Sequence, residues 1–315
     1  MSSSQRASKG ASPSRTVVTD RRGVPAGKGL VASPGTTTPL ALPSGTYAVS
    51  VEPLTNADHT VVAMASIAVL CAGGLLLYSL VAAAEAVANR KAFRVLLSGG
   101  STPKRLFQLL AEQPVRDLLP WSGTHLFWGD ERAVPPDHKD SNYRMTREAM
   151  LDTVSPPAAQ VHRLHGENPD LAAAATDYQK VVAGAFKADT DGPPPAFDLV
   201  FLGMGTDAHT ASLFPGTRAL GETRAWFVAN EVPQLNTRRL TATYPLLNAA
   251  RAVVFLAAGH DKAEPLGRVL APKGETSSAP SRGISPAGSL AWVIDKAAAA
   301  GIPQGCALGV TEHAG

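Results

Sequence analysis

Short apolar runs alternate with amphipathic stretches from residue 93 to residue 300. A run of about five apolar residues between turn residues is typical of a buried strand, whereas an apolar face that returns every three or four residues is typical of a helix. The pattern predicts strands over residues 93–97, 124–128, 161–164, 197–202, 226–230, 239–244 and 251–257. It predicts helices from Pro103 onward and over residues 141–151, 170–187, 261–270 and 290–300. Strands that alternate with helices indicate the α/β class, with a mostly parallel, Rossmann-like sheet flanked by helices.

The first 60 residues do not follow this pattern. Residues 1–47 are rich in Ser, Thr, Pro and Gly and have no sustained apolar period, so we expect residues 1–60 to form a disordered extension. The first 19 residues contain no acid and carry Ser and Arg. That composition is also typical of an organelle transit peptide.

Residues 61–84 form an apolar segment without a single charge. A run of about 20 apolar residues is long enough for a membrane span, and the basic residues Arg90, Lys91 and Arg94 would then keep the body cytoplasmic. The favoured prediction is instead a buried first helix that ends near Asn89, although an insertion or a coding-sequence error would also account for the run. The domain that carries the site is then expected over residues 85–315.

The net charge of +3 comes from the N-terminal stretch, because residues 1–47 hold six Lys and Arg against the single acid Asp20. The remaining chain is slightly acidic and therefore gives no sign of a nucleic-acid-binding surface. The two cysteines, Cys71 and Cys306, have no metal-ligand spacing and suit a reducing compartment. We therefore expect a cytoplasmic protein. An organelle reached through the extension, or a membrane tether through residues 61–84, is the alternative.

The chemistry is predicted to lie in residues 197–216, FDLVFLGMGTDAHTASLFPG, where a buried strand runs into glycines and then into clustered polar side chains. Open α/β sheets build their sites in this way, at the carboxyl ends of their strands. His209 is the candidate for proton transfer, because an unperturbed imidazole titrates near pH 6.5. The predicted supports of its loop are Gly203, Gly205 and Asp207.

Other strand ends supply further candidates. One predicted turn joins a strand to a helix and consists of Ser98, Gly99, Gly100, Ser101 and Thr102. Such a turn forms either an anion-binding site or a tight turn with a helix cap. Asp130, Glu131 and Arg132 suit a substrate clamp or a structural ion pair. Arg239 and Lys262 are expected either to be solvent-exposed charges or to bind one phosphate group together. No two histidines have HxH or HxxxH spacing, so no metal site is expected.

Five segments, in order and spacing, resemble those of the 6-phosphogluconolactonases: LSGGSTPKRLF, FWGDERAVPPDHKDSNYRM, FDLVFLGMGTDAHTASLFPG, RRLTATYPLLNAAR and AAGHDKAEPL. The resemblance covers about residues 82–300, and LAWVIDKAAA is similar to the family's last helix. It implies a glucosamine-6-phosphate-isomerase-like fold and hydrolysis of 6-phospho-D-glucono-1,5-lactone to 6-phosphogluconate in the oxidative pentose phosphate pathway. It implies no metal or organic cofactor, no nucleic-acid partner, and functional coupling to glucose-6-phosphate dehydrogenase.

The resemblance also implies roles for the candidate residues. His209 would be the general base that activates water, and Arg132 would lie near it and hold substrate or developing negative charge. Asp130 would belong to the catalytic group without a defined role. The phosphate would be bound by the turn at residues 98–102, with Arg239 and Lys262 as partners.

Ala208 departs from the family pattern, which has glycine immediately before the histidine. If this position needs a positive φ, alanine strains the loop by about 1 kcal/mol or more, and we expect Ala208→Gly to change the rate. Two other functions stay open: an aminosugar-6-phosphate deaminase or isomerase on the same fold, and a non-catalytic sugar-phosphate-binding protein. The first is disfavoured by Arg132 in place of tyrosine and by Leu213-Phe214-Pro215 in place of Asn-Glu-Pro.

Overall fold

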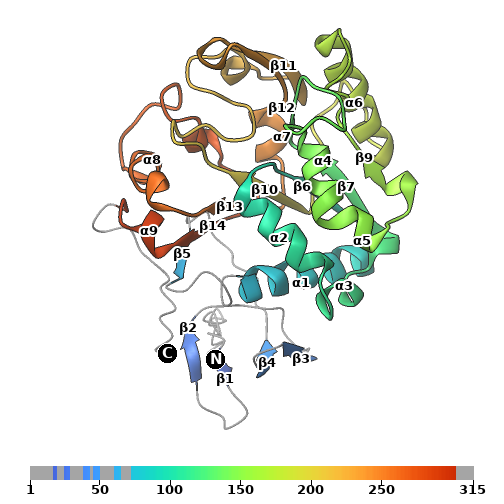
Figure 1. Cartoon of the computed structure of the whole chain (residues 1–315), viewed down its shortest axis with the longest axis vertical. Coiled ribbons are helices and arrows are strands. Elements are labelled where there is room, and N and C mark those ends of the chain that lie inside the picture. Colours follow the sequence, from blue (N-terminus) through green and yellow to red (C-terminus); the bar gives the residue numbers. More distant parts are fainter. Residues whose placement is uncertain are drawn as a thin grey trace, which may run out of the picture. The chain divides into compact units, whose positions relative to one another are not determined.

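The structure, a computed structural model, describes residues 72–302 and five short strands nearer the N-terminus (Figure 1). These strands are β1 (Val17–Thr19), β2 (Pro25–Lys28), β3 (Thr38–Leu42), β4 (Gly45–Val49) and β5 (Thr60–Met64). The chain divides into two compact units, one of residues 1–56 and 313–315 and the other of residues 57–312. Within the first unit, β1 pairs with β2 and β3 pairs with β4, both antiparallel.

Residues 1–60 were predicted to be disordered, but the structure shows β-strands at these five places. They contain Val, Thr and Tyr, which favour extended backbone. The other residues of that stretch lie outside the described ones.

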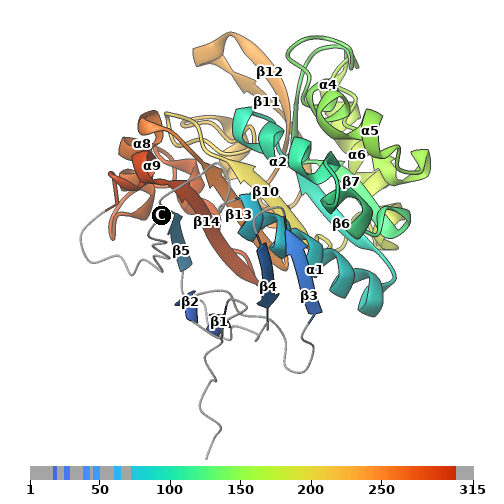
Figure 2. The same cartoon turned by 60° about the horizontal axis from the view of Figure 1, so that its bottom comes forward.

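A parallel sheet of seven strands forms the centre of the second unit, in the order β5-β14-β13-β10-β6-β7-β9. Its strands after β5 are β6 (Phe93–Leu97), β7 (Thr124–Trp128), β9 (Val161–His162), β10 (Leu199–Gly203), β13 (Ala252–Ala257) and β14 (Ser289–Asp295). Figure 2 shows β14, β13, β10 and β6 side by side. Without β5, the chain order across the sheet is 3-2-1-4-5-6, the doubly wound arrangement, so the predicted α/β class is confirmed.

Two segments of this sheet correct the predictions. Residues 60–64 are not part of an apolar helix but form β5, which pairs in parallel with β14. Residues 290–295, predicted as the start of a closing helix, belong to β14, and only Lys296–Ala299 is helical. Both are short apolar runs rich in β-branched residues, for which periodicity alone does not separate strand from helix. Among the described residues, no helix has the length and apolar character that crossing a membrane requires.

Helices flank the sheet: α1 (Ala72–Arg90), α2 (Ser101–Ala111), α3 (Val115–Leu118), α4 (Asn142–Thr146), α5 (Asp152–Val154), α6 (Leu171–Phe186), α7 (Tyr244–Asn248), α8 (Ala263–Leu270) and α9 (Lys296–Ala299). Helix α1 packs against β6 and α2, and α2 also reaches β10 and β13. At the end of α6, Phe186 meets Phe197 edge-on and Phe127 of β7 at a tilted angle, and Phe127 also meets Phe197 edge-on. On the other half of the sheet, Phe255 stacks on Trp292 with ring centroids 3.9 Å apart.

A second, antiparallel sheet has the order β11-β12-β8, with β8 (Asp130–Arg132), β11 (Phe227–Val232) and β12 (Thr237–Ala242). Strand β8 follows β7 after a single residue, Gly129, whose amide donates to Leu97 of β6 and whose carbonyl accepts from Ala242. Gly129 thus ties the small sheet to the carboxyl end of the large one. In Figures 1 and 2 the β11–β12 hairpin stands at that end.

Candidate functional site

The candidate site lies where the doubly wound sheet reverses its winding, between the adjacent strands β6 and β10. Ligands bind open α/β sheets at the carboxyl ends of the strands that flank such a switch point. Strand β6 leads into Ser98 and Gly99, and β10 ends at Gly203. A Cβ at Gly203 would lie 3.9 Å from the Gly99 carbonyl and from the Ser98 hydroxyl, so the two loops are neighbours.

The loop that carries His209 is closed by its own backbone. The amide of Gly205 donates to the His209 carbonyl at 2.9 Å, and the amide of Ala208 donates to the Gly205 carbonyl at 3.0 Å. The hydroxyl of Thr210 donates to the Gly203 carbonyl at 2.8 Å. Ala208 has a φ of 65°, so the sequence-based suspicion of a left-handed residue at this position is confirmed. Its methyl group is fully buried.

The His209 imidazole is fixed on three sides. Its Nδ1 lies 2.5 Å from Asp207 Oδ1, and the His209 amide donates to the same oxygen at 3.1 Å. The ring stacks on Phe214 with centroids 3.9 Å apart. Gly205 lies against the imidazole so closely that a Cβ there would overlap Nδ1. Desolvation acts to raise the pKa of Asp207, but the hydrogen bonds from His209 outweigh it, and the pKa is lowered.

Asp130 joins this loop to the rest of the site. Its carboxylate is buried and accepts a hydrogen bond from Ser212 Oγ at 2.7 Å and one from Asn142 Nδ2 at 3.1 Å. Asn142 also occupies the space beside Gly99, where any side chain would overlap its amide group. One carboxylate therefore holds the His209 loop, the start of α4 and, through Asn142, the loop after β6.

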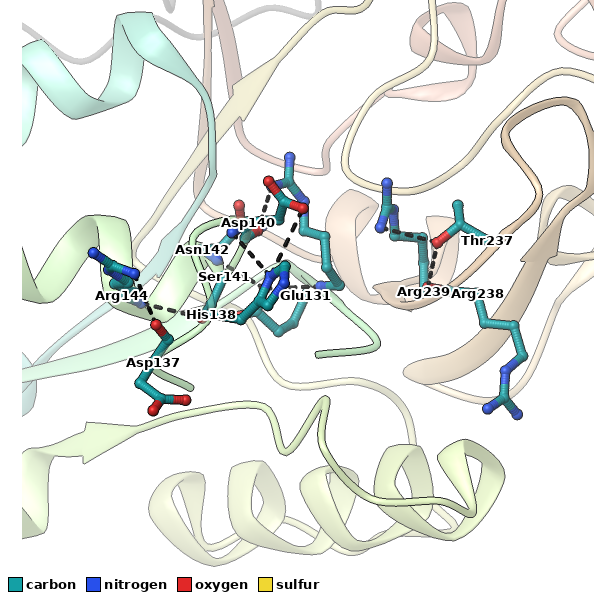
Figure 3. Close-up of polar contacts among 11 residues, drawn as sticks. Glu131, Asp137, His138, Asp140, Ser141, Asn142, Arg144, Thr237, Arg238 and Arg239 are labelled. Atoms are coloured by element: carbon teal, nitrogen blue, oxygen red, sulfur yellow. Dashed lines mark hydrogen bonds and ion pairs between the residues drawn. The ribbon is translucent and has the colours of Figure 1, made fainter. Parts of the chain in front are cut away.

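Glu131 caps the following helix. Its carboxylate accepts from the amides of Arg132, Asn142 and Tyr143, each at 2.8 Å, and from Ser141 Oγ at 3.0 Å. Burial raises the pKa of Glu131, and the backbone N–H groups at the start of α4 oppose that shift. Figure 3 shows Glu131 turned toward Ser141 and Asn142, which places the acid in the framework of the site.

Two arginines that the sequence singled out face each other in the small sheet, where Arg132 of β8 pairs in register with Arg239 of β12. Arg132 Nη1 donates to the Asp140 carbonyl at 2.6 Å, and Arg239 Nη1 lies 3.4 Å from Thr237 Oγ1. Burial lowers the pKa of the Arg239 guanidinium, and the positive charge of Arg132 lowers it further. In Figure 3, the side chain of Arg238 points away from that of Arg239. Two partly buried cations held together form a site that favours an anion.

The loop after β6 ends in an open helix N-terminus. Gly100, with φ 107°, is the N-cap of α2 and, having no side chain, does not cap the first amides of this helix. Ser98 is buried, whereas Ser101 is exposed and Thr102 partly so. Amides at a helix N-terminus together with hydroxyl groups form a ready site for phosphate.

Lys262 lies in η7 (His260–Lys262), beyond the carboxyl end of β13 and therefore on the same edge of the sheet. Its ammonium pairs with Asp261 at 2.9 Å. Within the described residues, no hydrogen bond or ion pair joins Lys262 to Arg239 or to the start of α2. Also among these residues, no cluster of three or more His, Cys, Asp or Glu could hold a metal ion.

Four residues that sequence reasoning did not select prove to support the site: Asn142, Ser212, Thr241 and Ser281. Thr241 Oγ1 accepts from the Ser212 amide at 3.1 Å, and Ser281 donates to the Ala208 carbonyl. Only Ser212 had a local signal, since it belongs to the polar cluster after β10. The others come from segments far away in the chain.

A doubly wound α/β fold with its polar groups at the switch point defines the class of protein. The model of the family described as glucosamine-6-phosphate isomerases/6-phosphogluconolactonase matches residues 72–292, and the chain belongs to this family. A Synechocystis protein named 6-phosphogluconolactonase is 46% identical over 216 residues, which cover 68% of this chain and 86% of the relative. A chloroplastic 6-phosphogluconolactonase 3 of Arabidopsis thaliana is 36% identical over 216 residues, 67% of this chain and 65% of the relative.

Solved structures agree with these relatives. The devB protein is 31% identical, covers 78% of this chain and 100% of its own, and superposes with a TM-score of 0.68. The 6-phosphogluconolactonase from Trypanosoma cruzi is 28% identical, covers 78% of this chain and 97% of its own, and also gives a TM-score of 0.68. The family predicted from five sequence segments is thereby confirmed.

Proposed function

We propose that this protein hydrolyses 6-phospho-D-glucono-1,5-lactone to 6-phosphogluconate. The observation that carries the proposal is the Asp207–His209 pair, held at 2.5 Å at the switch point of a fold shared with proteins named 6-phosphogluconolactonase. Hydrolysis of a lactone needs a base for water, a group that stabilises the oxyanion, and an anchor for the substrate. The site offers a candidate for each.

His209 is the base in this proposal. Asp207 accepts a hydrogen bond from Nδ1, which leaves the Nε2 lone pair to take a proton from water. The water oxygen attacks the lactone carbonyl carbon and forms a tetrahedral oxyanion. When this intermediate collapses, the bond from that carbon to the ring oxygen breaks, and the ring oxygen takes the proton back from Nε2. The lowered pKa of Asp207 keeps its carboxylate charged, which stabilises the imidazolium between the two steps.

The anions of the substrate divide between two groups of donors. The amides and hydroxyls of residues 98–102 at the start of α2, with Arg239 and Lys262, bind the phosphate, and Arg132 faces the oxygen on which negative charge develops. Asp130 takes a supporting rather than a catalytic role, because Ser212 and Asn142 already occupy its two carboxylate oxygens.

An aminosugar-6-phosphate deaminase or isomerase is the second candidate, because the family description covers both activities. Arg132 and Leu213-Phe214-Pro215 favour the lactonase, as do the names of the relatives. We also propose a cytoplasmic location, with entry into an organelle through the N-terminal extension as the alternative, which the chloroplastic names of some plant relatives motivate. Functional coupling to glucose-6-phosphate dehydrogenase belongs to the same proposal.

The test is the rate of acid release from freshly prepared lactone, measured above spontaneous hydrolysis. We expect the wild type to accelerate it and His209→Ala to lose about 10²–10⁴-fold in kcat. His165→Ala is the matched control, since the His165 side chain is 61% exposed. Equal rates for wild type and His209→Ala would refute the role of His209. Ammonia release from glucosamine 6-phosphate would support the second candidate, and no turnover of either substrate would leave only sugar-phosphate binding.

A further inference from the structure

Ser281 lies outside the five family-like segments and contacts the loop that carries His209. Its amide donates to the Ala208 carbonyl at 3.0 Å, and its hydroxyl donates to the same oxygen at 2.9 Å. Ser281 is 2% exposed and lies in η8 (Pro280–Gly283), 73 residues along the chain from Ala208. Both donors therefore act on Ala208, whose φ of 65° is unfavourable for an L-amino acid.

The peptide unit between Ala208 and His209 is fixed at both of its polar ends. Its carbonyl oxygen accepts the two hydrogen bonds from Ser281, and its N–H donates to Asp207 Oδ1 at 3.1 Å. If the preceding peptide unit stays in place, a change of the Ala208 φ to a negative value swings this carbonyl and amide about the Ala208 N–Cα bond and breaks all three hydrogen bonds. The same plane sets the direction in which the His209 side chain leaves the backbone, so its orientation controls the contact of the imidazole with Asp207.

The segment that carries Ser281 is itself anchored. Arg282 Nη1 donates to the carbonyls of Arg268, Val269 and Ala271 at 2.7–2.8 Å. Tyr244 OH donates to the Pro280 carbonyl at 2.8 Å. The segment that holds the Ala208 carbonyl is therefore tied to α8 and to Tyr244 by contacts of its own.

We infer that Ser281 is a positioning residue for His209, and that it is needed because alanine rather than glycine occupies position 208. The inference rests on the proposed lactonase function for its kinetic test and on the Asp207–His209 contact for its spectroscopic test. Glycine adopts positive φ without penalty, so the hydroxyl of Ser281 should matter much less in an Ala208→Gly background.

The experiment is a double-mutant cycle of Ser281→Ala and Ala208→Gly, with Ser278→Ala as the matched control. Ser278 lies in the same segment, is exposed, and bonds through its hydroxyl only to the nearby Glu275 carbonyl. We expect Ser281→Ala to lower kcat about tenfold, the equivalent of ~1.4 kcal/mol, with KM changed less than about twofold. The double variant should return to within about threefold of Ala208→Gly alone, and Ser278→Ala should match the wild type.

A second readout is independent of turnover. The proton between His209 Nδ1 and Asp207 should give a downfield NMR signal that disappears in His209→Ala, weakens in Ser281→Ala and returns in the double variant. An unchanged signal and kcat in Ser281→Ala, or no recovery in the double variant, would overturn the inference. If the wild type has no lactonase activity, the proposed function fails and the NMR signal alone decides the positioning role. If Ser281→Ala does not fold, a folded double variant with the signal supports the inference, and an unfolded one refutes it.

Discussion

The hydrogen bond between Ser212 and Asp130 offers a direct test of how the site is held together. Both residues are buried, at 1% and 6% exposure, and the bond length is 2.7 Å. Ser212→Ala removes one of the two side-chain donors to this carboxylate and creates almost no cavity. The backbone of residue 212 stays in place, because its amide still donates to Thr241 and its carbonyl still accepts from Asn230. The variant therefore isolates the loss of one charge-assisted bond.

The size of the effect follows from the burial. A hydrogen bond to a charged group contributes about 1.5–3 kcal/mol, and the carboxylate left with one donor fewer cannot regain water. A loss of about 2–3 kcal/mol corresponds to a fall in Tm of roughly 5–10 °C for a unit of this size. Because Ser212 lies three residues after His209, we also expect kcat to fall more than KM rises.

The measurement is urea and thermal unfolding of Ser212→Ala, Asp130→Asn and the double variant, with exposed Ser285→Ala as control. The double variant should lose less than the sum of the single losses, since an amide left unpaired costs less than a carboxylate. A Ser212→Ala stability within about 0.5 kcal/mol of wild type, or strictly additive losses, would refute the idea that this bond joins the loop to the site.

Three other variants test single contacts. Gly205→Ala should lower kcat by about 10²-fold without unfolding the protein, because the new Cβ displaces the His209 ring; a wild-type rate would contradict this geometry. Arg239→Gln should raise KM by about 10–100-fold, whereas exposed Arg238→Gln should not, as substrate-saturation curves will show. Burial and the charge of His125 lower the pKa of His162 to about 4. Between pH 4 and pH 6.5 the unfolded chain therefore binds more protons than the folded chain, and the stability of the fold decreases as the pH falls through that range. In His162→Phe this pH dependence of Tm should be weaker, and an identical dependence would refute the assignment.

The sequence predicted the parts of the fold and of the site that depend on local pattern. Strand β10 and its loop were found because an apolar run, glycines and the pair Asp207 and His209 lie within a few residues of one another. Periodicity failed at β14, where the apolar residues LAWVI run directly into an Ala-rich stretch and suggested one helix. It failed again at β5, whose five residues adjoin a longer apolar run.

The supports of the site could not be predicted because their partners are distant in the chain. The bond from Ser212 to Asp130 joins residues 82 positions apart, and the bond from Ser281 to Ala208 spans 73. Ser281 has no local pattern that distinguishes it from an ordinary polar residue, and Ser212 was marked only by its place in the polar cluster after β10. Asp130 illustrates the consequence: the sequence placed it in the catalytic group without a defined role, and its contacts with Ser212 and Asn142, on which the proposed supporting role rests, involve distant residues.

The strand order of the central sheet also bears on how the chain acquires its site during synthesis. Strands β6, β7 and β9 can pair once residue 162 is available, but the other side of β6 stays uncovered until β10 is made. An unpaired strand edge invites association with other chains. Ser281 emerges later still, so a nascent chain that already contains His209 lacks the clamp on its loop. Activity should therefore be among the last properties that a growing chain gains, and loss of the C-terminal segment from Pro280 onward should remove activity even where the strands before it still fold.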